Sequence, residues 1–214
     1  MALQALVFDA YGTLFDVHSV VRRSEAFWPG KGAALSQLWR AKQLEYTWQR
    51  SLMRSYVPFS QVTREALEYA CAALGLALDA GRTDALMQEY LRLATYPEVP
   101  AALAAMKARK AILSNGSPDM LTPLVAQSGL ALDAVLSVDE VKIFKPAPEV
   151  YQLAVDRLGV AKEDIGFVSS NCWDALGAKS FGFRVFWINR QQAPVDALGV
   201  KPDRIVQGAH EVLL

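Results

Sequence analysis

The spacing of apolar residues changes along this chain, and the changes separate a helical stretch from an alternating one. Residues 3–8 (LQALVF) form a short, mostly apolar run that ends at Asp9 and is followed by Gly12 and Thr13. A run of this length predicts a buried β-strand that delivers an acidic side chain into a loop. From about residue 17 to residue 94 the apolar positions follow helical spacing, and no convincing strand interrupts them.

After residue 99 the pattern alternates between helical and strand-like segments. We expect a helix over 99–109, a strand over 110–115, a helix from Pro118, a strand over 134–137, a helix over 148–158, a strand over 165–170, a helix over 174–181, a strand over 183–188 and a short C-terminal pair. Alternating strands and helices predict a parallel sheet with helices on both faces.

These patterns together predict the α/β class, with a Rossmann-like parallel sheet core and a helical cap inserted after the first strand. The expected core comprises residues 1–15 and 96–214, and the expected cap comprises residues 16–95. In such sheets ligands bind outside the carboxyl ends of the strands, so candidate chemistry is sought there.

The amino-acid composition excludes some classes of binding partner for this chain. Hydrophobic residues make up 52% of the 214 positions and charged residues 21%, which is typical of a globular protein. Lysine and arginine equal aspartate and glutamate at 22 each, so no overall charge recruits nucleic acid or a membrane. No apolar stretch is long enough to span a bilayer, and no basic residue precedes the apolar N-terminus as in a secretory signal. We expect a cytoplasmic protein.

The scarcity of cysteine and histidine excludes several kinds of site. Cys71 and Cys172 lie far apart without CxxC spacing, which argues against a disulfide framework and a zinc site. Neither His18 nor His210 lies beside a candidate nucleophile, so a Ser or Cys triad lacks its base. Any hydrolysis must therefore use mainly carboxylates, lysine and arginine.

Polar residues follow four expected strands or begin the next helix. They are Asp9, then Ser114 with Asn115, then Lys145, and then Ser169, Ser170, Asn171 and Asp174. Each has an ordinary explanation by itself: a turn aspartate, a surface lysine, or an acid in the first turn of a helix. Their co-occurrence at one edge of a parallel sheet predicts that they converge. Ser117 is expected to cap the helix that begins at Pro118, and periodicity does not decide the direction of Arg40.

Five blocks of the sequence resemble the haloacid dehalogenase superfamily, and more narrowly its type II L-2-haloacid dehalogenases. They are FDAYGTLFD (8–16), LWRAKQLEYTW (38–48), AILSNGSPDML (111–121), VKIFKPAPEVY (141–151) and FVSSNCWD (167–174). The resemblance covers residues 3 to about 190 and is specific, because its blocks lie in both the expected core and the expected cap.

The resemblance also separates this chain from the magnesium-dependent phosphatases of the superfamily. Those enzymes use a DxDxT motif whose second acid protonates the leaving alcohol, and here that position is Tyr11. A tyrosine with a pKa near 10 is a poor acid at neutral pH. Serines 169 and 170 stand where a paired acid would help to bind magnesium, so we expect no metal and no other cofactor.

The resemblance implies hydrolysis of short L-2-haloalkanoic acids to D-2-hydroxy acids by way of an ester on Asp9. It implies roles in catalysis for Asp9, Thr13, Arg40, Ser114, Lys145, Tyr151, Ser169, Asn171 and Asp174, and contacts to substrate from Tyr11, Arg40, Leu44, Phe59, Ser114, Asn115 and Trp173. Asp174 is expected to activate water, whereas Arg40 and Asn115 are expected to accept the halide.

Several alternatives stay open at this point. The main rival is a magnesium-dependent small-molecule phosphatase of the same fold, and a second is a catalytically silent binding module. A phosphonate hydrolase would need a lysine in the cap that forms a Schiff base. Lys31 and Lys42 are the candidates, and neither has a neighbouring feature in the sequence that would lower its pKa. The expected partners are a 2-haloacid and a halide, and the resemblance implies a homodimer to which Trp39 and Trp48 contribute.

Overall fold

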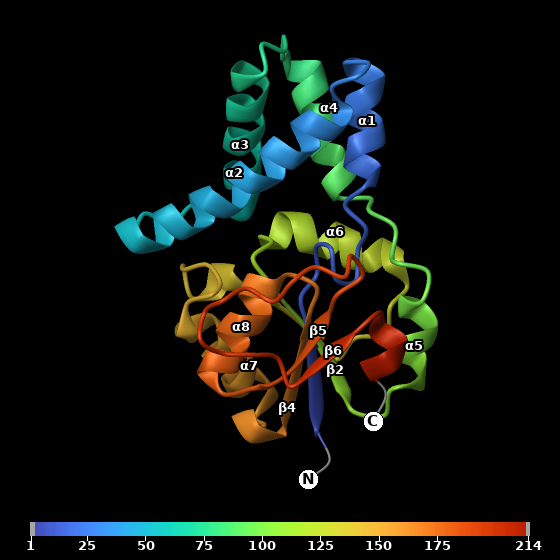
Figure 1. The fold of residues 1–214 in the computed structure, drawn as a ribbon, viewed down its shortest axis with the longest axis vertical. Helices are drawn as coiled ribbons and strands as arrows, with labels where there is room; N and C mark the ends of the chain where they lie inside the picture. Colours follow the sequence, from blue (N-terminus) through green and yellow to red (C-terminus); the bar gives the residue numbers. More distant parts are fainter. Residues whose placement is uncertain (1–2, 213–214) are drawn as a thin grey trace.

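The computed structural model describes residues 3–212, which form a six-stranded sheet flanked by helices and a second group of helices beyond one end of the sheet (Figure 1). The strands are β1 (Ala5–Phe8), β2 (Arg109–Ser114), β3 (Ala134–Ser137), β4 (Ile165–Ser169), β5 (Arg184–Ile188) and β6 (Arg204–Val206). All five neighbouring pairs run parallel, in the order β3-β2-β1-β4-β5-β6. The predicted α/β class with a parallel Rossmann-like sheet is confirmed.

The helices fall into two groups in Figure 1. Helices α1 (Ser19–Phe27), α2 (Gly32–Met53), α3 (Phe59–Ala73) and α4 (Ala80–Tyr90) stand together at the end of the molecule away from the N-terminus. Helices α5 (Val99–Ala105), α6 (Pro118–Ser128), α7 (Pro148–Leu158) and α8 (Cys172–Phe181) accompany the sheet, as do the short 3₁₀ turns η1 (Val138–Glu140), η2 (Lys162–Asp164) and η3 (Ala209–Val212). The carboxyl ends of the strands therefore face the first group of helices.

Local sequence signals explain where several helices begin and end. Helices α6 and α7 each have proline in the first turn, where the missing N–H has no helical partner to lose. Gly129 and Gly159 follow their last residues with φ angles of 67° and 62°, a left-handed conformation that glycine adopts without strain. The predicted bounds of α7 are met to the residue for this reason.

Other expected bounds and contacts are corrected. The helix expected over 99–109 ends at Ala105, and α8 begins at Cys172 instead of residue 174. Ser117 makes no side-chain cap on α6; its hydroxyl instead accepts a hydrogen bond from the Ser60 amide of α3 at 3.1 Å. A residue expected to act within one helix thus connects the two groups of helices.

Trp39 cannot contribute to a dimer surface as expected. Its side chain is fully buried, and its indole N–H donates to the Thr63 carbonyl over 2.7 Å. Trp48, in the next turns of α2, is 36% exposed and packs edge-on against Trp173 at 5.5 Å between ring centroids. Trp39 belongs to the core of the helical group, and Trp48 lies at its boundary with the sheet.

The core of the sheet positions a set of polar residues at its edge. Strand β1 lies between β2 and β4, with Phe8 opposite Ile112 and Val168, and all four of its residues are buried. The next residue, Asp9, donates its amide to the Val168 carbonyl at 2.9 Å and therefore leaves the sheet in a fixed direction. None of the helices within residues 3–212 is long and apolar enough to cross a bilayer.

Candidate active site

Asp9 lies at the carboxyl end of β1 with its carboxylate held on both oxygens. Asp9 is only 7% exposed to solvent. The Thr13 hydroxyl (3.0 Å) and the Asn171 amide (2.9 Å) donate to Oδ2, while the ammonium nitrogen of Lys145 lies 3.1 Å from Oδ1. A buried carboxylate needs such partners to remain charged. Their fixed positions also aim it, which suits a nucleophile.

Lys145 joins Asp9 to a second carboxylate, that of Asp174. Its ammonium nitrogen lies 3.0 Å from Asp174 Oδ2, and the residue is 1% exposed. Burial by itself disfavours the ammonium form, but the charges of Asp174 and Asp9 outweigh that effect and raise the pKa of Lys145 above its ordinary value. Lys145 is therefore a permanent cation between two acids.

The environment of Asp174 differs from that of Asp9, because Asp174 is wholly enclosed. Burial raises the pKa of Asp174 to about 6; the charge of Lys145 opposes this shift and the charge of Asp9 adds to it. The Tyr151 hydroxyl donates to Asp174 Oδ1 at 2.8 Å, and burial followed by the charge of Asp174 raises the pKa of Tyr151 well above its ordinary value. Tyr151 therefore keeps its proton and acts as a donor to Asp174. A carboxyl group with a pKa near 6 suits a general base.

The loop after β4 fixes the direction of the Thr13 hydroxyl. The Ser170 amide donates to Thr13 Oγ1 at 2.8 Å, and the Ser170 hydroxyl donates to the Gly12 carbonyl at 2.7 Å. The single proton of the Thr13 hydroxyl has two acceptors within reach, Asp9 Oδ2 at 3.0 Å and Ser170 Oγ at 3.2 Å. The charged and nearer Asp9 oxygen is the stronger acceptor, so the proton is directed to Asp9. Ser169 acts on the same loop, where its hydroxyl accepts the Asn171 amide N–H at 3.1 Å.

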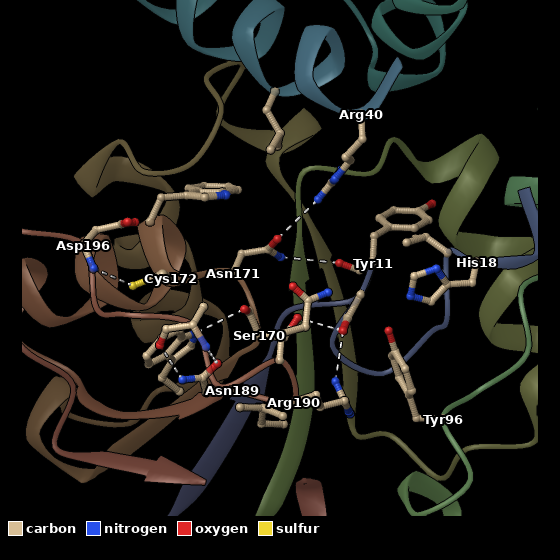
Figure 2. A pocket seen from close by; sticks show the side chains of 18 of the residues that line it. Tyr11, His18, Arg40, Tyr96, Ser170, Asn171, Cys172, Asn189, Arg190 and Asp196 are labelled. Carbon is tan, nitrogen blue, oxygen red and sulfur yellow. Dashed lines mark hydrogen bonds between the residues drawn. The ribbon is translucent and has the colours of Figure 1, made fainter. Parts of the chain in front are cut away.

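Arg40 comes from α2 in the distant group of helices and reaches the sheet, which decides the direction that periodicity left open. Its Nη2 lies 3.5 Å from Asn171 Oδ1, a contact drawn in Figure 2. Its Nη1 donates to Gln43 Oε1 at 2.6 Å, and the Gln43 amide in turn donates to Thr63 Oγ1 at 2.8 Å. Gln43 is fully buried, so it holds the guanidinium in place from behind.

A cavity of about 430 Å³ opens beside these groups, between α2 and the ends of β4 and β5. Of the residues expected to contact a substrate, Tyr11, Arg40, Leu44 and Trp173 line it, together with Asn171. Figure 2 shows Arg40 and Asn171 pointing toward one another across its upper part. The cavity therefore has apolar and aromatic walls with a few convergent polar groups, as ligand sites have.

Three other expected contact residues, Phe59, Ser114 and Asn115, do not line this cavity. Phe59 is buried with its ring centroid 6.0 Å from that of Tyr11, so it supports Tyr11 from the α3 side. The Ser114 hydroxyl accepts a hydrogen bond from the Gly116 amide at 3.0 Å. Asn115 Oδ1 accepts the backbone N–H of Lys145 at 2.9 Å, which positions the lysine.

Sequence reasoning missed Gln43 and Arg190, and it placed Ser170 at this edge of the sheet without a role in the site. Gln43 lies three residues after Arg40 on one helix, where side chains meet, so its spacing was a usable signal. Arg190 follows the end of β5 at the same edge of the sheet as the other polar residues and lines the cavity. Arg190 could have been predicted by the same reasoning about the carboxyl ends of the strands, because it follows β5.

The donor set does not fit a hard divalent cation. Among residues 3–212 there is no group of three or more His, Cys, Asp and Glu side chains that could hold a metal ion. The ammonium group of Lys145 lies between the two carboxylates that such an ion would need. Tyr11 cannot replace a carboxylic acid as proton donor either, because burial raises its pKa well above the ordinary value.

The arrangement can therefore attack an electrophilic carbon and then hydrolyse the ester that results. Asp9 is an aimed carboxylate, Asp174 a second carboxylate whose pKa is raised by burial, and Lys145 the cation that stabilises both. Arg40 places N–H donors beside the cavity, where a leaving group would need stabilisation.

Comparison with known proteins agrees with this chemistry. A sequence model of the haloacid dehalogenase-like hydrolases matches residues 3–182. The (S)-2-haloacid dehalogenase H-109 of Pseudomonas putida is 49% identical over 215 residues, which cover 98% of this chain and 96% of that protein.

Solved structures show the same likeness. An L-2-haloacid dehalogenase superimposes with a TM-score of 0.96 at 47% identity, covering 99% of this chain and 97% of that one. The L-2-haloacid dehalogenase of Xanthobacter autotrophicus with chloropropionic acid covalently bound gives a TM-score of 0.92 at 42% identity, covering 98% and 96% of the two chains. Matches of this extent show that the chain belongs to the haloacid dehalogenase-like hydrolases, in the group of the L-2-haloacid dehalogenases.

Proposed function

We propose that this protein hydrolyses short L-2-haloalkanoic acids to D-2-hydroxy acids through an ester formed on Asp9. The observation that carries the proposal is the buried Lys145 ammonium group held between the carboxylates of Asp9 and Asp174, with Tyr11 in place of a second acid near the nucleophile. Relatives named for the same reaction, one of them with a haloacid covalently bound, support it.

In the first step a carboxylate oxygen of Asp9 attacks C2 of the substrate from the side opposite the halogen. The new C–O bond forms as the carbon–halogen bond breaks, and the halide leaves with the bonding electron pair, which inverts the stereocentre. Thr13, Asn171 and Lys145 hold the carboxylate in the attacking position. Positioning of this kind supplies much of the rate, because carboxylates in water are weak nucleophiles toward carbon.

Arg40 receives the departing halide, with Asn115 as the second proposed acceptor. Arg40 is a permanent cation with several N–H donors, so it stabilises the negative charge that develops without giving up a proton to Asp9. The hydrogen bond from Arg40 to Gln43 keeps the guanidinium group from turning away into solvent. Leu44, Trp173, Tyr11 and the supporting Phe59 surround the reacting carbon with apolar surface that limits competing water.

The substrate carboxylate is proposed to bind to Ser114 and to the loop amides near Tyr11. Ser114 is fully buried beside the nucleophile strand, and its hydroxyl accepts the Gly116 amide, which leaves the hydroxyl proton for an anion. Backbone and hydroxyl donors are suited to a carboxylate because they add no negative charge to the site.

In the second step Asp174 takes a proton from water, which attacks the carbonyl carbon of the Asp9 ester. Cleavage of the acyl C–O bond expels the alkoxide, which takes the proton from Asp174 and leaves as the 2-hydroxy acid. Loss of one proton to solvent restores the Asp9 carboxylate, now with one oxygen from solvent. Tyr151 and Lys145 hold Asp174 during this step, while Ser169 and Asn171 hold the loop beside it. The carboxyl group of Asp174 is suited to this role by its raised pKa of about 6.

The reaction needs no metal ion under this proposal, because Lys145 supplies the positive charge that a cation would otherwise provide. At the distances of 3.0 and 3.1 Å and an effective dielectric constant near 20, each ion pair has roughly 5 kcal/mol of raw attraction. We also propose that residues 16–95 act as a cap that closes the site. The separate grouping of helices α1 to α4 supports this division. The cytoplasmic location stays a prediction.

We propose a homodimer that uses the end of α2. Leu52 and Met53 are 86% and 66% exposed there, and an apolar surface of this kind favours burial against a second subunit. Light scattering should give twice the chain mass for the wild type, and Leu52→Glu should shift it toward the monomer. A monomeric wild type would contradict the proposal.

A halide-release assay with L- and D-2-chloropropionate and p-nitrophenyl phosphate, each with and without EDTA, tests the function. We expect chloride from the L-isomer alone, unchanged by EDTA, and no phosphate. Phosphate release that EDTA abolishes and magnesium restores would identify a phosphatase instead. Binding of L-2-chloropropionate without chloride release would identify a silent binding module.

A further inference from the structure

Arg190 follows the carboxyl end of β5 and donates hydrogen bonds to the backbone of the loop after Asp9, the proposed nucleophile. Its Nη1 donates to the Gly12 carbonyl and its Nη2 to the Thr13 carbonyl, each at 3.1 Å. The side chain is 21% exposed, so these bonds are partly shielded from water. Nothing in the mechanism above uses this residue, although it lines the cavity (Figure 2).

The same guanidinium group holds the segment that leads from α4 to α5. Nη2 lies 2.7 Å from Glu98 Oε1, and the central carbon of the guanidinium lies 3.7 Å from the ring centroid of Tyr96. Figure 2 shows Arg190 and Tyr96 next to one another at the lower rim of the cavity. Arg190 therefore contacts both the nucleophile loop and the chain that returns from the first group of helices.

These two parts of the chain are also paired with each other. The Tyr96 amide donates to the Leu14 carbonyl at 3.0 Å, and the Asp16 amide donates to the Ala94 carbonyl at 2.8 Å. An antiparallel bridge between Phe15 and Thr95 lies between those bonds. The two crossings between helices α1 to α4 and the sheet thus form one short ribbon, and Arg190 lies against its end on the sheet side.

The loop that Arg190 holds controls a hydrogen bond to the nucleophile. Thr13 donates its hydroxyl proton to Asp9, and that direction depends on where the Gly12–Thr13 backbone lies relative to Ser170. A displacement of the two carbonyls by a fraction of an ångström would move the Thr13 hydroxyl by a similar amount. Errors of about 1 Å in such positions can cost on the order of 100-fold in rate.

We propose that Arg190 is a positioning residue for the nucleophile, which couples the ribbon between the cap and the sheet to the Thr13 hydrogen bond on Asp9. The proposal rests on the function proposed above. Arginine is required because one planar guanidinium group must donate to the carbonyls of Gly12 and Thr13 and to the Glu98 carboxylate while it stacks on the Tyr96 ring. Lysine keeps the charge but has a single nitrogen, so it cannot maintain all four contacts.

Arg190→Lys should therefore slow the first chemical step selectively. We expect halide release in a single turnover with L-2-chloropropionate to fall about tenfold or more, with KM for that substrate changed little, because loss of a positioning contact acts mainly on the transition state. The second step depends on Asp174, Tyr151 and Lys145, none of which Arg190 contacts. Intact-mass measurement at steady state should accordingly show a smaller fraction of enzyme carrying the ester than in the wild type.

Arg204→Lys is the matched control, because Arg204 is an exposed arginine over an aromatic ring, with its guanidinium 5.7 Å from the centroid of Phe186. It should leave both steps unchanged. A double-mutant cycle adds a second readout: in a Thr13→Ala background Arg190→Lys should cost much less than it does alone, because the contact through which it acts is gone.

The results separate the two proposals. Wild-type protein that releases no halide refutes the proposed function. If the wild type is active, equal single-turnover rates in Arg190→Lys, or a loss that adds fully to that of Thr13→Ala, overturn the role of Arg190. If Arg190→Lys does not fold, Glu98→Gln tests the role of Arg190 instead. This variant keeps a hydrogen-bond acceptor for Arg190 but removes the negative charge. We expect about a threefold loss in the rate of halide release alone, because the ion pair between Arg190 and residue 98 is weakened near the surface. An unchanged rate would refute the coupling.

Discussion

The ammonium nitrogen of Lys145 lies 3.0 Å from Asp174 Oδ2, and both side chains are almost wholly buried. The same nitrogen is 3.1 Å from Asp9 Oδ1, so one cation is shared by two buried acids. Without it the acids would repel one another in a medium that screens charge weakly. Lys145 therefore supports both proposed steps of the reaction.

Replacing Lys145 by methionine should abolish turnover and destabilise the fold. One carboxylate must then take up a proton, and breaking a buried ion pair costs about 3–5 kcal/mol. The folded-state pKa of an acid left without its cation is raised, so stability should be greatest at low pH and fall as pH rises through that pKa. Thermal melts at pH 5 and pH 8 measure the difference. Lys142→Met, which removes an exposed lysine paired with Asp139, should change neither property appreciably.

The pH dependence of ester hydrolysis should report Asp174. The free enzyme holds this group at a pKa of about 6, raised by burial and, secondarily, by the charge of Asp9. Esterification removes that charge, so in the intermediate the pKa should lie below 6. Stopped-flow and quench measurements should therefore show hydrolysis falling with one protonation below pH 6, while the first halide release continues. A hydrolysis rate that is flat down to pH 4 would contradict the role of Asp174 as base.

Asp174→Asn should separate the two steps. Halide departure needs no base, whereas ester hydrolysis does, so we expect a burst of about one halide per site with little hydroxy acid. In the wild type, a single turnover in heavy-oxygen water should place the label in the peptide that contains Asp9 and leave the first product unlabelled. Label in the first product would mean that water attacks C2 directly and that Asp9 is only a base.

Arg40→Lys should lose most of the halide-release rate although the charge is retained. The structure holds the Arg40 fork between Gln43 and Asn171, and a lysine ammonium cannot satisfy both partners from one position. Single-turnover rates with chloro- and bromopropionate measure the loss, which should be larger for the poorer leaving group. Arg50→Lys, on the same helix but paired with Glu65, is the control and should behave as the wild type.

Gly177→Ala should impair hydrolysis from outside the cavity. A Cβ atom at this position would lie 2.6 Å from the Tyr151 hydroxyl and 2.5 Å from Pro146 Cβ, so the tyrosine must shift away from Asp174. We expect slower ester hydrolysis and a lower melting temperature, read by ester accumulation in mass spectra. Gly81→Ala in α4 is a matched control: its Cβ would only meet Asp79 Oδ1 at 3.4 Å, and alanine is favoured there by about 1 kcal/mol.

Local sequence patterns are enough to predict most of the elements and the edge of the sheet where chemistry occurs. Apolar runs mark β1 and β4, and proline and glycine mark the ends of α7, because these signals act within a few residues. Parallel strands then bring their carboxyl ends together whatever the details of packing. Asp9 and Asp174 could therefore be expected at one site although 165 positions separate them in the numbering of the chain.

How these residues meet depends on the packing of segments that are far apart in the chain. Arg40 reaches Asn171 across 131 positions of sequence, and its direction depends on the crossing of α2 over the sheet. Trp39 and Trp48 have similar sequence signals, yet one is buried and the other is partly exposed. Ser117 bonds to Ser60 instead of its own helix, and Arg190 holds Gly12, Thr13 and Glu98 at once. Such contacts require segments that are remote in sequence to be placed relative to one another within a few tenths of an ångström, and no local pattern records that placement.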